Sequence, residues 1–169
     1  MVKYHPDCCI VWFDAHADLN TPETSETGYL GGLALSGPAG LWDSGLGNGL
    51  RIDQLVLVGQ RDLDPFEMAL IDQHKIPHIQ PGDTLTEGLR DAIAGRAVYV
   101  HLDCDVPEPG IVPTDYRSAG GLTLKDLSAC SEINAAHPFV GIEIAEFQNA
   151  WTPVSPSALL DALSPLINL

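Results

Sequence analysis

Two short motifs in the chain carry closely spaced side chains that can bind metal. They read Asp-Ala-His-Ala-Asp at positions 14–18 and Asp-Cys-Asp at positions 103–105. Alternate residues of an extended chain point to the same side, so each motif would present its ligands on one face. Carboxylate oxygens with one imidazole favour Mn²⁺, Mg²⁺ or Fe²⁺ over a thiolate zinc site. The predicted metal ligands are Asp14, His16, Asp18, Asp103 and Asp105.

The elements that position these motifs are apolar runs alternating with helical segments. Apolar runs predict four strands, at Cys8–Phe13, Gln54–Gly59, Ala97–Leu102 and Phe139–Ala145. Capping residues and helical patterns predict four helices, at Pro65–His74, Thr86–Ile93, Thr123–Ala136 and Ser155–Leu163. This alternation predicts a three-layer, doubly wound parallel β-sheet with helices on both faces. Ligands of such sheets collect at the carboxyl ends of the strands, where both motifs lie.

The main alternative to a metal site is that these carboxylates only cap helices, and their position at strand ends helps to distinguish the two. Four carboxylates on one patch repel one another unless a cation neutralises them. Either motif alone would leave helix capping about as probable as a metal site, but the two motifs together at strand ends favour a metal site.

Length and charge narrow the class of protein. The 169 residues fit a single α/β domain spanning residues 1–169, and the first strand starts so early that N-terminal elements are expected to be missing. The formal net charge of -15 argues against nucleic acid and anionic membranes as partners and suits a cationic substrate. Four cysteines without a CxxC pair indicate reduced thiols in a cytoplasmic protein, and no apolar run reaches the length of a membrane span.

Four motifs, in order, resemble those of the ureohydrolase superfamily, which includes arginase and agmatinase. Segment 11–22 (VWFDAHADLNTP) is similar to the first metal motif of that family, and 102–105 (LDCD) with 120–123 (GGLT) to the second. Segments 59–65 (GQRDLDP) and 141–147 (GIEIAEF) resemble two parts of its substrate site. The resemblance runs from His5 to about Asn149 and implies an arginase-like fold.

The resemblance also implies two manganese sites and a reaction. Asp14 and Asp103 match ligands that bridge the two ions, Asp18 matches a ligand of one ion, and His16 and Asp105 match ligands of the other. Asp14 and Asp103 would thereby be catalytic. The implied reaction is attack of a metal-bridging hydroxide on the carbon of a guanidino compound, which releases urea. Arginine, agmatine and guanidino acids all remain candidate substrates, and a homo-oligomer is the expected assembly.

Further positions match the family's substrate-binding residues. Glu146 matches the catalytic carboxylate that pairs with the guanidinium, a contact suited to two N–H donors. Asp64 matches the residue that holds the α-amino end, and Asn20 and Thr27 match positions that contact an α-carboxylate. The alternatives are a surface ion pair for Glu146 and a helix N-cap for Asp64.

The chain also departs from the family pattern. A metal-binding histidine that the family carries upstream of the first motif has no counterpart here, which would weaken one of the two metal sites. Gly31 stands where the family has a proton-shuttling histidine, and Glu108 stands where it prefers aspartate. These departures leave open a catalytically inactive family member, or an incomplete fragment that binds only metal or a partner.

His101 is a histidine of this chain that could compensate for the family histidines it lacks. It shares alternation parity with Asp103 and Asp105, so on a regular strand it would point toward the metal side. We therefore include it among the predicted catalytic residues, as a base that supports the metal ligands or replaces the absent histidine. The alternative is a buried histidine whose ring bonds a backbone carbonyl.

Overall fold

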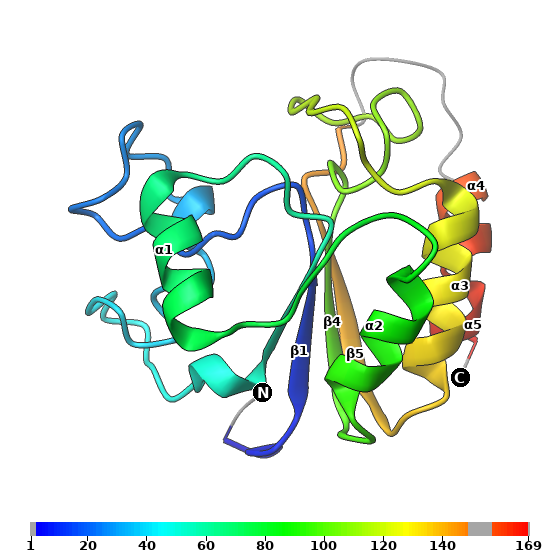
Figure 1. The fold of residues 1–169 in the computed structure, drawn as a ribbon, viewed down its shortest axis with the longest axis horizontal. Helices are drawn as coiled ribbons and strands as arrows, with labels where there is room; N and C mark the ends of the chain where they lie inside the picture. Colours follow the sequence, from blue (N-terminus) through cyan, green and yellow to red (C-terminus); the bar gives the residue numbers. More distant parts are fainter. Residues whose placement is uncertain (1–2, 149–156, 169) are drawn as a thin grey trace.

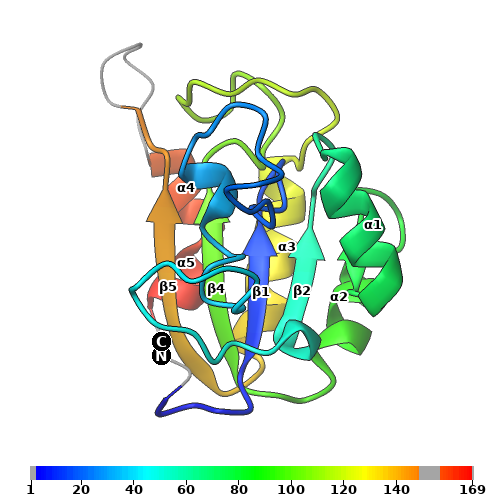
Figure 2. The same ribbon diagram turned by 90° about the vertical axis from the view of Figure 1, so that its left-hand side faces the viewer.

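A computed structural model describes residues 3–148 and 157–168 and contains one parallel β-sheet (Figures 1 and 2). Its strands lie in the order β3-β2-β1-β4-β5, and every neighbouring pair is parallel. The strands are β1 Cys9–Phe13, β2 Leu55–Val58, β3 His78–Ile79, β4 Val98–Asp103 and β5 Phe139–Ala145. The four predicted strands are present. The fifth, β3, escaped prediction because two residues carry no periodic signal.

Helices cover both faces of the sheet, which confirms the predicted fold class (Figure 1). The α-helices are α1 Pro65–His74, α2 Leu85–Ile93, α3 Leu124–Ala135, α4 Ser157–Ala162 and α5 Ser164–Ile167. Helices α2 to α5 lie on one face, and α1 lies on the other with the loops that follow β1. Of the helix predicted at Ser155–Leu163, the first two residues lie outside the described part of the chain, the next six form α4, and Leu163 is the N-cap residue of α5.

Two hydrophobic clusters, one on each face, hold the sheet between these layers. Within β1, Cys9, Val11 and Phe13 belong to the cluster beneath α2, α3 and α4, whereas Ile10 and Trp12 belong to the cluster beneath α1. Every residue of β1 is buried, as expected for a central parallel strand covered on both faces. The alternation that separates the two clusters also directs Asp14, which follows Phe13, toward the α1 side.

The start of α1 connects the sheet to the loop after β1. Asp64 is the N-cap residue and Pro65 opens the helix, as predicted. The buried Glu67 carboxylate accepts hydrogen bonds from the backbone N–H groups of Asp64, at 3.0 Å, and Leu19, at 2.9 Å. These bonds fix the segment that leaves the first metal motif.

The sequence also raised expectations about the cysteines and about membrane-spanning segments. All four cysteine side chains are buried, and burial raises the pKa of the thiol in each. Among the described residues, no helix is both long enough and apolar enough to cross a membrane.

Candidate metal centre

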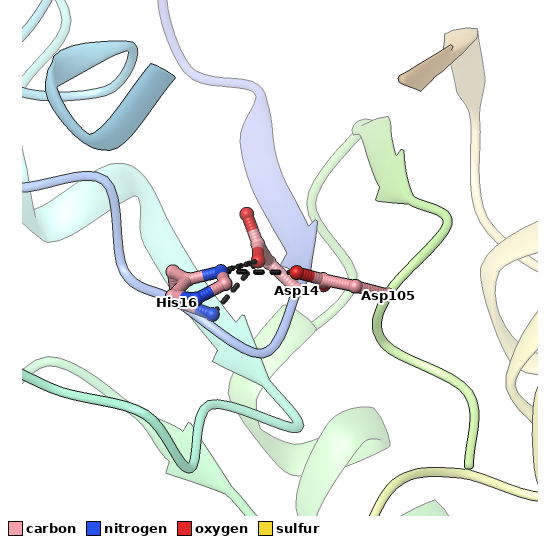
Figure 3. Close-up of side chains that lie close together, drawn as sticks. All are labelled: Asp14, His16 and Asp105. Carbon is pink, nitrogen blue, oxygen red and sulfur yellow. Dashed lines mark hydrogen bonds and ion pairs between the residues drawn. The ribbon is translucent and has the colours of Figure 1, made fainter. Parts of the chain in front are cut away.

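The two acidic motifs meet at the carboxyl ends of β1 and β4. These strands are direct neighbours, with Phe13 opposite Leu102, so Asp14, which follows β1, lies beside Asp103, the last residue of β4. Figure 3 shows how Asp14, His16 and Asp105 then turn toward one another. The convergence follows from strand register, because the carboxyl ends of parallel strands lie at one edge of the sheet.

Asp14, His16 and Asp105 form a first group of potential ligands, with one ligand atom from each lying within 4.8 Å of the others. His16 Nδ1 lies 3.0 Å from Asp105 Oδ2 and 3.3 Å from Asp14 Oδ1. The second carboxylate oxygen of Asp105 accepts the Ala15 N–H at 3.0 Å. The two motifs therefore hold each other in place across the sheet edge.

Asp14, His101 and Asp103 form a second group by the same criterion, again with ligand atoms within 4.8 Å of one another. Asp14 belongs to both groups and is almost fully buried, at 1% exposure. Trp12 Nε1 donates a 3.1 Å hydrogen bond to Asp14 Oδ2, which fixes the carboxylate between the groups. One shared carboxylate between two ligand sets is the arrangement expected of a binuclear metal site.

Asp18, the fifth predicted ligand, belongs to neither three-residue group of the described chain. The chain leaves the extended conformation after Phe13, and Asp18 has a left-handed φ of 54°. Simple strand alternation is therefore not what positions it. It is nonetheless buried, and this burial, reinforced by the charges of Asp14 and Asp103, raises the pKa of Asp18 well above its ordinary value.

The electrostatics of the cluster show an excess of buried negative charge. Burial, reinforced by the neighbouring Asp14 and Asp105 charges, raises the pKa of Asp103 to about 8. Burial also raises the pKa of Asp14. Burial alone would lower the pKa of His16, but its bonds to Asp105 and Asp14 raise it to about 11. The donor set thus fits a divalent cation, which would relieve this repulsion.

Arg61 is a structural residue of the site that sequence reasoning missed. Its Nη2 donates to the backbone carbonyls of Asp105, at 2.8 Å, and Ser118, at 2.7 Å. Its own backbone N–H donates to the Ala15 carbonyl at 2.8 Å. Arg61 therefore connects the two metal motifs, contacting the first through its backbone and the second through its side chain. Arg61 lies within the segment GQRDLDP, but the neighbouring residues in the sequence do not indicate that its side chain bonds to backbone carbonyls far along the chain.

A cavity of about 380 Å³ opens beside the metal cluster. The predicted metal ligands His16, Asp103 and Asp105 line it. The four predicted substrate-binding residues line it as well, namely Asn20, Thr27, Asp64 and Glu146. Asn20 Nδ2 donates to Asp64 Oδ2 at 2.7 Å, so two of these four residues already contact each other. His101 does not line this cavity.

Tyr29 occupies the space beside Gly31, a feature the sequence did not reveal. A Cβ atom added at Gly31 would lie 2.3 Å from the Tyr29 ring, so a side chain at position 31 requires Tyr29 to move. The Tyr29 hydroxyl donates to Glu146 Oε1 at 3.1 Å. The Tyr116 ring also lines the cavity and packs in a T-shaped arrangement against His16, with ring centroids 5.3 Å apart and an interplanar angle of 75°.

Glu108, the departure noted in the second motif, has a clear structural role. Its Oε2 accepts the backbone N–H groups of both Gly120 and Gly121 at 2.8 Å. Gly121 packs so tightly on Pro107 that a Cβ there would lie 2.5 Å from its carbonyl. The longer glutamate therefore joins the Gly-Gly-Leu-Thr loop to the metal motif.

Comparison with known proteins places the chain in a class. The model of the arginase family matches residues 1–162, and the chain belongs to that family. Among curated relatives, it is 44% identical over 146 residues to the N(omega)-hydroxy-L-arginine amidinohydrolase of Streptomyces lavendulae, covering 86% of this chain and 54% of that protein. It is 31% identical over 140 residues to an arginase of Staphylococcus aureus, covering 73% of this chain and 46% of the relative. The chain thus spans about half the length of these relatives.

Solved structures agree on the fold. The arginase of Bacillus subtilis superposes with a TM-score of 0.88 at 20% identity, covering 99% of this chain and 66% of the other. The proclavaminate amidino hydrolase of Streptomyces clavuligerus gives a TM-score of 0.75 at 20% identity, covering 97% and 55%. At these identities the likeness bears on the fold alone.

Proposed function

We propose that this protein is a manganese-dependent hydrolase that cleaves a guanidino compound and releases urea. One observation carries the proposal: the cavity that borders the carboxylate cluster is also lined by Glu146, the predicted guanidinium partner. Membership of the arginase family supports hydrolysis of this kind. The charge of the cavity suits a cation, because Asp and Glu side chains dominate its ionisable lining.

The family resemblance suggests a role for each ligand. Asp14 and Asp103 would hold both ions, His16 and Asp105 would hold one of them, and Asp18 would support the other. The membership of Asp14 in both ligand groups supports this assignment. Bound manganese would polarise water and stabilise negative charge during hydrolysis.

The chain's own residues would bind and orient the substrate. Glu146 would accept two N–H groups of the guanidinium, a paired and charge-assisted contact. In the present arrangement Tyr29 occupies one of its oxygens, so the phenol would either turn aside or remain as a third partner. Asn20, Asp64 and Thr27 line the same cavity and would bind the polar end of an amino-acid substrate.

The relative from Streptomyces lavendulae bears a name that describes cleavage of N(omega)-hydroxy-L-arginine. Its 44% identity adds that compound to arginine, agmatine and guanidino acids as candidates. Glycine at position 31 removes a potential general base, and this favours the second candidate function, a family member that binds metal without turnover. A homo-oligomer and a cytoplasmic location stay predictions.

The test is release of urea, or of hydroxyurea from the hydroxylated substrate, by the manganese-loaded chain from a panel of the three named compounds and representative guanidino acids. Glu146→Gln should lower kcat/KM by roughly 10–100-fold, because a neutral amide loses the charge-assisted pairing. Glu87→Gln, on the exposed side of α2, is the matched control and should leave turnover unchanged. Full metal content with no product from any compound would instead support the inactive family member.

A further inference from the structure

His101 is buried inside the protein and is contacted by side chains of both neighbouring strands. It lies in β4, is only 6% exposed, and sits in register between Trp12 of β1 and Glu143 of β5. Its ring stacks on that of Trp12, with centroids 3.4 Å apart and planes 6° from parallel. Its Nδ1 lies 2.8 Å from Glu143 Oε1. Side chains of the two neighbouring strands, β1 and β5, therefore set the orientation of the imidazole.

The other ring nitrogen has no partner. Nε2 of His101 is buried and makes no hydrogen bond with any described residue. Buried polar atoms are seldom left unpaired, because losing hydration without a replacement bond is costly. A ring nitrogen of His101 also lies within 4.8 Å of carboxylate oxygens of Asp14 and Asp103. Because Glu143 engages Nδ1, Nε2 is the nitrogen left to face those carboxylates.

We propose that His101 Nε2 is a direct ligand of one manganese ion, which it binds together with Asp14 and Asp103. This inference rests on the metal centre of the proposed function and adds a second imidazole to it. Glu143 acts as a positioning residue, since a carboxylate that accepts the Nδ1 hydrogen leaves the Nε2 lone pair free for a metal. The imidazole would thereby supply a nitrogen ligand from within β4.

This role differs from the base that sequence parity suggested. A base acting on substrate must reach the cavity, and His101 does not line it. It also differs from a histidine that merely bonds a backbone carbonyl, since its Nδ1 partner is a carboxylate and its Nε2 has none. Placement beside Asp14, with a fixed tautomer, is what a metal ligand requires.

The test compares manganese binding by three variants with the unaltered chain, using equilibrium dialysis and elemental analysis. His101→Asn should bind one ion at least about 100-fold more weakly, since it loses a direct ligand. Glu143→Gln should weaken the same ion by roughly 10–100-fold, the usual effect of losing the residue that orients a ligating histidine. His74→Asn, an exposed histidine on α1, should leave both affinities unchanged. Pulsed electron paramagnetic resonance should detect one fewer histidine nitrogen coupled to manganese in His101→Asn.

The outcomes separate this inference from the proposed function. If the unaltered chain binds manganese and His101→Asn binds it equally well, His101 is not a ligand and the proposed function stands. If the unaltered chain binds no manganese, both fail. If His101→Asn does not fold, Glu143→Gln decides, because its side chain is half exposed and its change conserves volume. Unchanged manganese affinity in that folded variant would overturn the inference.

Discussion

Replacing Arg61 by methionine should destabilise the protein through the backbone of the second metal motif. Methionine keeps much of the apolar stem but removes every donor of the guanidinium. The carbonyls of Asp105 and Ser118 then lose their shortest bonds, at 2.8 and 2.7 Å. Hydrogen bonds to charged groups each contribute about 1.5–3 kcal/mol. Because Arg61 is only half buried, we take the lower end for these two bonds and expect a loss of about 3 kcal/mol.

Thermal unfolding measures this loss directly. For a chain of this size, each kcal/mol lowers Tm by about 2–4 °C, so Arg61→Met should unfold about 6–12 °C earlier. Arg61→Lys should lose nearly as much, because an ammonium cannot reproduce the planar fork. Manganese affinity should fall in both variants, since the Asp105 backbone is released.

Arg90 supplies the control for loss of a positive charge. It is exposed near the end of α2, and Arg90→Met should cost less than about 1 kcal/mol. If Arg61→Met also costs less than about 1 kcal/mol, the carbonyl contacts do not stabilise the motif. If Arg61→Lys is as stable as the unaltered chain, charge matters and the fork does not.

Three further predictions concern packing and ionisation. Gly121→Ala should lower the free energy of unfolding, measured in urea, by about 2 kcal/mol, because the added Cβ would lie 2.5 Å from the Pro107 backbone. Gly32→Ala is the control and should cost little, since the space around Gly32 is open. Equal stability of the two variants would refute the packing argument. Burial raises the pKa of Cys104 and Cys130 to about 12, so the folded protein should react with a thiol reagent near pH 8 far more slowly than the four cysteines of the urea-unfolded chain. The hydrogen bond to Glu146 raises the pKa of Tyr29 to about 12 by stabilising the protonated phenol. In an ultraviolet titration, Glu146→Gln should therefore return the pKa of one tyrosine toward its usual value near 10. An unchanged titration curve would show that the bond is not made in solution.

The fold and the acidic cluster were predictable because each is encoded locally. Apolar runs that end in a carboxylate mark both a buried strand and its functional end, as at Phe13 and Asp14. The cap at Thr123, whose side chain accepts the Asp126 N–H at 3.1 Å, marks the start of α3 in the same way. Strand β3 could not be predicted, since its two residues are set by pairing with β2 and not by a pattern of their own.

The rest of the site depends on contacts between segments far apart in the sequence. The environment of His101 comes from the lateral register of three strands, which pairs it with Trp12 and Glu143. Strand alternation predicts the face of the sheet toward which the His101 side chain points, but it does not predict which side chains contact it. Arg61 and Tyr29 likewise act on partners 44 and 117 residues away, at Asp105 and Glu146. No local propensity contains that information.

A manganese titration of the unaltered chain and of Asp14→Asn tests the central claim most directly. Asp14 belongs to both ligand groups, so the account predicts about two ions per chain and a large loss of binding at both sites in the variant. Calorimetry gives the number of ions and their affinities together. Less than one ion per chain, or two ions bound equally well by Asp14→Asn, would contradict a binuclear centre built on this carboxylate.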